Sequence, residues 1–224
     1  MKNVKKDENM SVFLKKRLAK DGNKCYDINN LLEIMRFLRS ENGCPWDKEQ
    51  THSSIKMNFI EEVYEAVDAI DKNDVDGLKE ELGDVLLQIV FHSVIEEEKH
   101  RFSFQEVVNG ICEKLIERHP HVFSDLVVSD TDTVLKNWDE IKNKTKGIET
   151  AKESILAVPD SFPALLKAQK IIKRAKKSGL VIDEKSNDNP LGEELFFICN
   201  KADENGIDAE EALLSYIGDV LNKM

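Results

Sequence analysis

The sequence has few residues that interrupt helices and no apolar run long enough to cross a membrane. Only five prolines and ten glycines are spread over 224 residues. A membrane-spanning helix needs about 18 consecutive apolar residues, and no segment reaches that length. The basic start, MKNVKKDENM, is followed by no apolar segment typical of a signal peptide. These absences predict a protein that is neither exported nor embedded in a membrane.

The cysteines lack the spacing of a disulfide framework or a zinc ribbon. They are Cys25, Cys44, Cys112 and Cys199, and no two form a Cys-x-x-Cys pair. A chain of this length buries enough apolar surface to fold without cross-links. We therefore expect reduced thiols and a cytoplasmic protein.

Basic residues are too few to balance the acidic ones. The chain has 32 Lys and Arg against 43 Asp and Glu, a formal net charge of -11. Because this charge repels nucleic-acid backbones, we expect no nucleic acid polymer as a partner. The Gly-rich loop of P-loop ATPases and the Gly-x-Ser-x-Gly turn of serine hydrolases are also missing. A small phosphate-bearing ligand stays compatible with the charge if a metal ion accompanies it.

Between the few breaks, apolar residues recur at spacings of three and four, as on one face of an α-helix. The pattern predicts an all-α fold with helices at about 28–40, 51–72, 77–99, 104–118 and 133–144. Asp27 is placed to cap the first helix, and Gly43 follows its end.

The apolar residues of the second and third helices predict which faces turn inward. On the second helix these residues are Ile55, Phe59, Val63, Val67 and Ile70. The middle of the third helix, residues 85–91, is apolar almost all round. It should therefore lie within a bundle or at a subunit interface.

Two clusters of carboxylates stand on these consecutive helices. The first is Glu61, Glu62 and Glu65, and the second is Glu80, Glu81 and Asp84. Each spans positions i, i+1 and i+4, an arc of roughly 100° on a helix. Like charges at this spacing cost an isolated helix about 0.2–0.5 kcal/mol per pair. A short turn between the helices makes them antiparallel neighbours, so the two clusters can converge.

Convergent carboxylates near a core must be paired, protonated or bound to a metal. Mg²⁺ prefers hard oxygen ligands and bridges carboxylates to substrate phosphates. The spacing favours Glu62, Glu65, Glu81 and Asp84 as its ligands. Glu61 and Glu80 then remain to orient or deprotonate a water molecule. The alternative is that each cluster is only a solvated acidic surface.

Five motifs in fixed order make the chain resemble the MazG-type nucleoside triphosphate pyrophosphohydrolases between about residues 31 and 146. They are GCPWDKEQTH at 43–52, EEVYE at 61–65, KEELGDVLLQIVFH at 79–92, KLIERHPHVF at 114–123 and WDEIK at 138–142. The resemblance implies a four-helix catalytic module, usually a homodimer. It also implies hydrolysis between the α and β phosphates with Mg²⁺, for which Mn²⁺ can substitute.

The resemblance places the same carboxylates in the metal site, with Glu61 and Glu80 as acidic support. Trp46 either stacks on a nucleotide base or packs as a plug in its loop. Further positions expected to bind substrate are Gln50, His52, Arg118, Lys142 and Lys146.

The second half of the chain contains an incomplete echo of the first. LLKAQKIIKRAKKSG at 165–179 is similar to LLEIMRFLRSENG at 31–43, and residues 191–198 match the apolar pattern of 82–89. The connecting segments differ, since 38 residues at 44–81 correspond to 11 at 180–190. We expect an N-terminal extension at 1–26, a catalytic bundle at 27–150 and a degenerate, shortened helical module at 160–224.

Two other functions compete with hydrolysis. A non-catalytic nucleotide sensor or assembly scaffold would keep the fold and bind nucleotides without turnover. A di-iron carboxylate bundle needs Glu-x-x-His on two helices. Only Glu97-x-x-His100 is present, at a predicted helix end.

Overall fold

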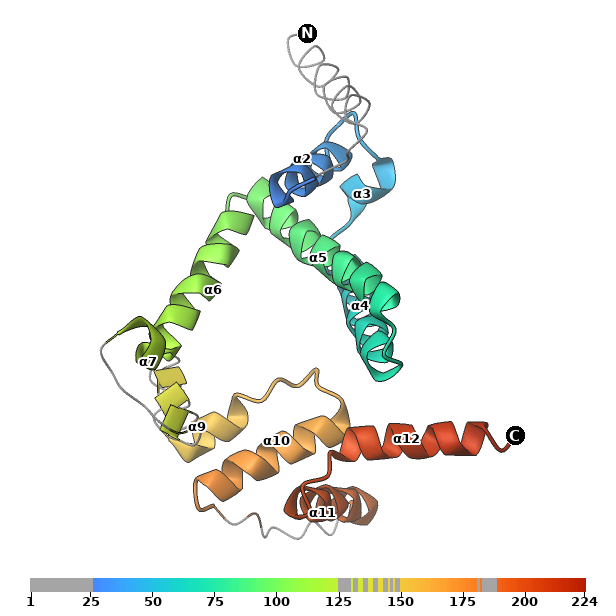
Figure 1. Ribbon diagram of the computed structural model, residues 1–224, viewed down its shortest axis with the longest axis vertical. Helices are drawn as coiled ribbons and strands as arrows, with labels where there is room; N and C mark the ends of the chain where they lie inside the picture. The colour runs from blue at the N-terminus through green and yellow to red at the C-terminus, as the bar shows by residue number, and fades with distance from the viewer. Residues whose placement is uncertain are drawn as a thin grey trace. The chain divides into compact units, whose positions relative to one another are not determined.

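The structure is a computed structural model that describes residues 26–124, 130, 133–134, 137–138, 141–142, 145, 147, 150–180, 182 and 189–224. Its regular elements in these ranges are all helices, which confirms the all-α prediction (Figure 1). The chain divides into an N-terminal unit that ends at Lys114 and a C-terminal unit that begins at Leu115. In the described part of the chain, no helix is both long enough and apolar enough to cross a membrane.

The N-terminal unit contains the helices predicted from the apolar spacing. They are α2 (Ile28–Leu38), the short α3 (Pro45–Glu49), α4 (His52–Asp71), α5 (Val75–Glu98) and most of α6 (Phe104–Arg118). Side-chain caps fix where three of them begin. Asp27, Thr51 and Asp74 accept hydrogen bonds from backbone N–H groups in the first turns of α2, α4 and α5. Asn73, with a φ of 54°, makes the tight turn between α4 and α5.

The core of this unit lies where α2 packs against the C-terminal half of α5. Its buried side chains are Leu32 and Met35 from α2, Ile55 from α4, and Val90, Phe91, Val94 and Ile95 from α5. Helices α4 and α5 lie side by side along their lengths (Figure 1). Their far ends therefore extend beyond the core, and those ends carry the carboxylates.

The contact between α4 and α5 follows one narrow row of positions on each helix, which we call the seam. On α4 the seam contains Ile55, Phe59, Glu62, Ala66 and Ala69, at intervals of four, three, four and three residues. The inward face expected for Val63, Val67 and Ile70 was wrong, because their side chains are 42%, 46% and 58% exposed. They form a second row beside the seam. The small Ala66 and Ala69 face α5 instead, since small side chains let two helices approach closely.

Arg39, at the end of α2, joins three parts of the N-terminal unit. Its guanidinium donates two hydrogen bonds of 2.8 Å to the carboxylate of Glu98 on α5. The remaining nitrogen donates to the carbonyls of Asp47 at 2.5 Å and Gln50 at 3.2 Å. These carbonyls lie at the C-terminal end of α3, so one buried side chain fixes α3 against α2 and α5.

The C-terminal unit contains α7 (Pro120–Phe123), α9 (Ala151–Leu156), α10 (Ala164–Lys177), α11 (Pro190–Glu204) and α12 (Ala209–Leu221). Ile172, Cys199 and Ala209 form its small buried core. The buried amide of Gln169 donates to the Ile207 carbonyl at 2.8 Å and accepts from the Ala209 N–H at 2.9 Å. This pair of bonds ties α10 to the start of α12.

The boundary between the two compact units falls inside α6, upstream of residue 150. The assignment of 27–150 to one catalytic module and of 160–224 to a degenerate one stays a prediction. Much of the helix expected at 133–144 lies outside the described residues, as do Lys146 and most of the N-terminal extension.

We predict that Arg39→Met lowers the free energy of unfolding by about 2 kcal/mol, because charge-assisted hydrogen bonds and two carbonyl partners are lost together. Arg36 is the matched control, since it makes the same bidentate bond to Glu97 at 3.0 Å but on the exposed surface. Arg36→Met should cost less than about 1 kcal/mol. Urea unfolding of both variants checks the difference, and equal losses would contradict it.

Candidate metal and phosphate site

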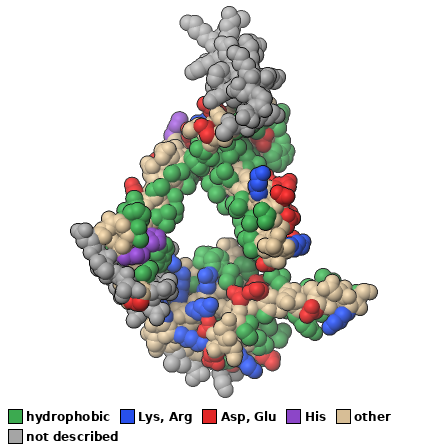
Figure 2. Space-filling view, viewed as in Figure 1, with side chains coloured by type: hydrophobic (Ala, Val, Ile, Leu, Met, Phe, Trp, Pro, Cys, Tyr) green, Lys and Arg blue, Asp and Glu red, His purple; other side chains and the backbone are tan. Residues whose placement is uncertain are grey.

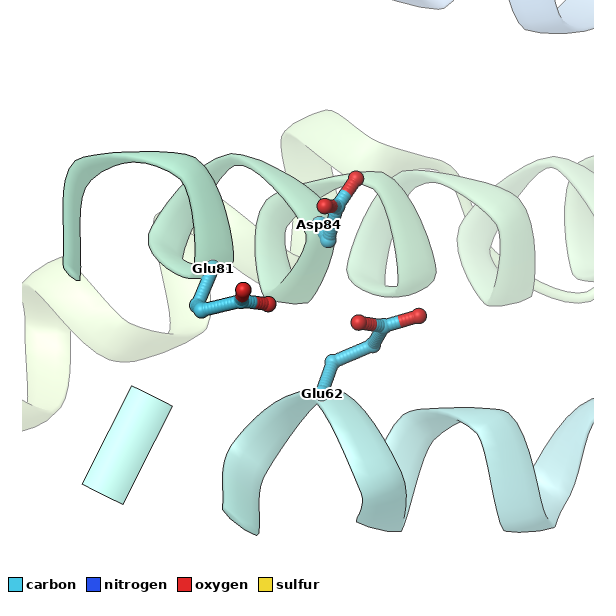
Figure 3. Close-up of side chains that lie close together, drawn as sticks. All are labelled: Glu62, Glu81 and Asp84. Atoms are coloured by element: carbon cyan, nitrogen blue, oxygen red, sulfur yellow. The ribbon is translucent and has the colours of Figure 1, made fainter. Parts of the chain in front are cut away.

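Three of the predicted carboxylates converge on the seam between α4 and α5. Glu62 comes from α4, and Glu81 and Asp84 come from consecutive turns of α5 (Figure 3). One oxygen from each lies within 4.8 Å of the others, and all three side chains are half-buried. Glu62 lies between Ile55 and Ala66 in the seam row, so a position suited to an apolar side chain holds an acid.

The pKa values in this cluster reflect burial and the repulsion between neighbouring carboxylates. The pKa of Glu62 is raised, first by desolvation and then by the charges of Asp84 and Glu65, while a hydrogen bond from Gln88 opposes the rise. The pKa of Glu81 is also raised, first by desolvation and then by Glu65 and Asp84. A raised carboxyl pKa means that the folded protein disfavours the charged form without a counter-charge.

The remaining predicted acids surround these three. Glu61, Glu65 and Glu80 are exposed. Glu65 lies outside the group of oxygens within 4.8 Å, yet its charge contributes to the raised pKa of both Glu62 and Glu81. Glu61 and Glu80 are adjacent in sequence to Glu62 and Glu81, at the edge of the cluster.

The donor set fits a hard divalent cation. Carboxylate oxygens are the ligands that Mg²⁺ and Mn²⁺ prefer, and three converge here from two rigid helices. Across the described ranges, no Lys or Arg forms an ion pair with Glu62, Glu81 or Asp84. Within the described residues, therefore, no Lys or Arg neutralises the cluster by an ion pair.

The polar row of α5 continues away from the acids through Gln88 and His92 to Glu96. His52, at the start of α4, contacts the Nδ1 atom of His92 at 2.7 Å and also bonds the buried Glu96. Hydrogen bonds from Arg101 and then His52 lower the pKa of Glu96 to about 2. Burial and then His52 lower the pKa of His92. The structure thus places His52, a predicted substrate residue, in an internal network.

Trp46 and Gln50 lie on and just after α3. The Trp46 side chain is 58% exposed, so the ring does not act as a buried plug. The Gln50 amide donates to the Trp46 carbonyl at 2.8 Å, and its oxygen accepts from the Ser54 hydroxyl at 2.8 Å. Gln50 therefore braces α3, from which the Trp46 ring projects.

Arg118 lies in a small aromatic cluster of the C-terminal unit. Its guanidinium stands 5.5 Å from the ring centre of Trp138, and His119 meets the same ring edge-on at 4.8 Å. Arg118 is buried, and neither its Nε nor the Nδ1 of His121 has a hydrogen-bond partner within the described ranges. Lys142 is half-buried.

Sequence reasoning missed Gln88 and Trp138. Gln88 is the single polar residue in the apolar stretch 85–91 and stands one turn after Asp84, which is a signal visible in the sequence. Trp138 stands in the WDEIK motif, but its contact with Arg118 joins positions separated by a loop. Only the tertiary structure brings that pair together.

We predict that, without metal, Glu62→Gln unfolds at a higher temperature than the wild type at about pH 8. The folded-state pKa of Glu62 is raised, so the wild type loses stability as the pH rises through that pKa. The variant carries one charge fewer and avoids much of this loss. As the pH falls to about 4.5, the wild-type carboxyl binds its proton and the advantage should shrink.

Thermal unfolding in EDTA at both pH values measures this difference. Glu113→Gln, at an exposed position of α6, is the control for removing a carboxylate elsewhere. An advantage of Glu62→Gln that is equal at both pH values would argue against charge repulsion as its cause.

Comparisons with known proteins identify the family of the chain. Residues 50–123, which include both carboxylate helices, match the MazG nucleotide pyrophosphohydrolase domain. Over 213 residues the chain is 38% identical to a nucleoside triphosphate pyrophosphohydrolase of Escherichia coli (strain K12), covering 83% of this chain and 81% of that protein.

Two further relatives match the chain over a shorter alignment. The chain is 48% identical over 149 residues to the uncharacterized protein YabN of Bacillus subtilis, covering 66% of this chain but 30% of that protein. It is 44% identical over 149 residues to the nucleoside triphosphate pyrophosphohydrolase/pyrophosphatase MazG of Thermotoga maritima, covering 66% and 56%. The domain match and the extended identity together show that the chain belongs to the MazG family.

Proposed function

We propose that the protein hydrolyses nucleoside triphosphates between the α and β phosphates, releasing a nucleoside monophosphate and pyrophosphate. The observation that carries the proposal is the convergence of Glu62, Glu81 and Asp84, none of which forms an ion pair with a Lys or Arg that the structure describes. Relatives named nucleoside triphosphate pyrophosphohydrolases support it, since they share the helices that bear these acids. Mg²⁺ is the proposed cofactor, with Mn²⁺ as a substitute.

In this proposal Glu62, Glu81 and Asp84 hold the cation, and Glu65 completes the acidic shell. The bound cation would neutralise phosphate charge and help to position the triphosphate. Glu61 and Glu80 orient the attacking water and take its proton. The water oxygen bonds to the α phosphorus as the bond to the bridging oxygen breaks, and pyrophosphate leaves.

The remaining predicted residues are proposed to bind or support the substrate. The exposed Trp46 ring is suited to stack on a base, because α3 is held in place by Arg39. Gln50 and His52 support this region through their internal hydrogen bonds. Arg118, Lys142 and Lys146 are proposed to supply positive charge for the phosphates.

We also propose that the protein acts as a homodimer, because apolar side chains outside the seam are exposed. They are Ile60, Val63, Val67 and Ile70 on α4, Leu82 and Leu86 on α5, and Val107, Ile111, Leu115 and Ile116 on α6. Figure 2 shows apolar side chains at the surface along α6, whose one buried side chain is that of Arg118. A second copy could cover these rows and complete a four-helix arrangement.

A cytoplasmic location fits the proposed substrate and the thiols. Cys44, Cys112 and Cys199 are free. Free thiols suit a reducing compartment, so we propose that the protein works there.

We predict that Glu62→Ala lowers pyrophosphate release by roughly 100-fold or more, since one carboxylate of the cation site is lost. Pyrophosphate is measured with a panel of nucleoside triphosphates and Mg²⁺. Glu193→Ala is the matched control, because Glu193 lies on α11 at the position that corresponds to Asp84 in the sequence echo. That variant should retain wild-type rates.

The same assay separates hydrolysis from its alternative. If the wild type binds nucleotides but releases no pyrophosphate from any of them, the protein is a sensor or scaffold. If Glu62→Ala and Glu193→Ala are equally active, catalysis lies elsewhere in the chain.

We predict that Val67→Lys raises the dissociation constant of the dimer by roughly 10-fold or more, because a charge would be buried in an apolar contact. Asp71→Lys, at an exposed polar position of the same helix, is the control. Sedimentation equilibrium measures both variants. A wild type that stays monomeric at micromolar concentration would contradict the dimer.

A further inference from the structure

Gln88 has a buried amide with one half of its hydrogen-bonding capacity unused. The residue is only 8% exposed and stands one helical turn beyond Asp84 on α5. Its side chain is close enough to Glu62 to lower the pKa of that carboxyl by hydrogen bonding, a role in which an amide acts through its N–H group. Its Oε1 atom is buried and has no hydrogen-bond partner in the ranges that the structure describes.

A buried carbonyl without a donor is unfavourable, and native proteins contain few of them. The next polar side chain along α5, that of His92, does not donate to this carbonyl. His92 contacts His52 at 2.7 Å and stacks on it, with ring centres 5.0 Å apart. The carboxylate of Glu62 accepts hydrogen bonds when it is charged, and in that form it cannot donate to Oε1.

A hydrated cation would supply the missing donor. Mg²⁺ and its substitute Mn²⁺ usually keep several water molecules when carboxylates bind them, and those waters are hydrogen-bond donors. Gln88 lowers the pKa of Glu62, one of the three converging acids, and stands one helical turn after Asp84, so its amide lies at the edge of the proposed cation site. A hydrated cation bound here would therefore give the Oε1 atom of Gln88 a hydrogen-bond donor and give the acids a counter-charge.

We propose that Gln88 is a positioning residue of the cation site: its N–H group fixes the carboxylate of Glu62, and its carbonyl accepts from water that the cation carries. The inference rests on the proposed function, because it requires a cation at Glu62, Glu81 and Asp84. Partners of this kind orient the carboxylates that bind a metal, and their loss typically weakens metal binding by about 10- to 100-fold.

A purely structural role makes a different prediction. If Gln88 only strengthens the seam, its replacement lowers stability in the absence of metal and leaves metal affinity unchanged. If Gln88 positions Glu62 and the hydrated cation, an isosteric apolar side chain removes one hydrogen bond but also removes the unsatisfied carbonyl. Stability without metal then changes little, while metal affinity falls.

The test uses the full-length protein with Mn²⁺ alone as the probe, because electron paramagnetic resonance counts free Mn²⁺ without any substrate. Gln88→Met keeps the length and volume of the side chain and loses both polar groups. Gln88→Asn keeps the amide but withdraws it by one methylene group. Unfolding temperatures in EDTA accompany each titration, so that a folding defect is seen separately.

Gln169→Met is the matched control, since Gln169 is a second buried glutamine, in the C-terminal unit, with both halves of its amide satisfied. We expect it to lower the unfolding temperature and to leave Mn²⁺ affinity unchanged. We expect Gln88→Met and Gln88→Asn to raise the dissociation constant for Mn²⁺ by about 10-fold or more.

Wild-type affinity in both Gln88 variants would overturn the inference while leaving the proposed function intact. Failure of the wild type itself to bind Mn²⁺ and to release pyrophosphate would instead overturn the proposed function. A loss of affinity in Gln169→Met equal to that in Gln88→Met would also count against a specific role for Gln88.

Discussion

The site depends on one constraint: acidic side chains occupy seam positions between two helices, where apolar residues would ordinarily pack. Glu62, Glu81 and Asp84 weaken the α4/α5 contact where they meet. The helices must therefore be held together elsewhere. The apolar core lies at the opposite end of α5, and Arg39 fixes α2 and α3 to that end. Stability at one end makes it feasible to keep like charges together at the other.

The two ends of the polar row on α5 show what a counter-charge does. Glu96 is buried, yet Arg101 and His52 hold its pKa at about 2. Glu62 and Glu81 are less buried, yet their pKa values are raised. Burial alone therefore does not set the direction of these shifts. The difference is that Glu96 has cationic partners, whereas Glu62 and Glu81 have none among the described residues, which is the physical argument for an external cation.

Much of the N-terminal unit follows from local sequence, because local forces determine those features. Asp27 and Thr51 cap helices where the pattern predicts, and the spacing of Glu81 and Asp84 puts both on one face. Which side of α4 packs against α5 could not be predicted in the same way. Val63 and Ala66 lie on adjacent rows, and ranking by hydrophobicity selects the larger residue. The close approach of α5 instead favours the smaller residue, Ala66, at the contact. This preference can be recognised only when the positions of both helices are known.

The C-terminal unit shows why a single acidic helix does not make such a site. The echo of α5 in α11 keeps Glu193, but the sequence between the repeated segments is too short for a counterpart of α4. A carboxylate cluster of this kind needs acids from two antiparallel helices, because one helix presents too few at a common point. Among the described residues, the three acids that converge come from α4 and α5. We therefore propose that the C-terminal unit, if it is the shortened module that its sequence predicts, holds no cation site of its own.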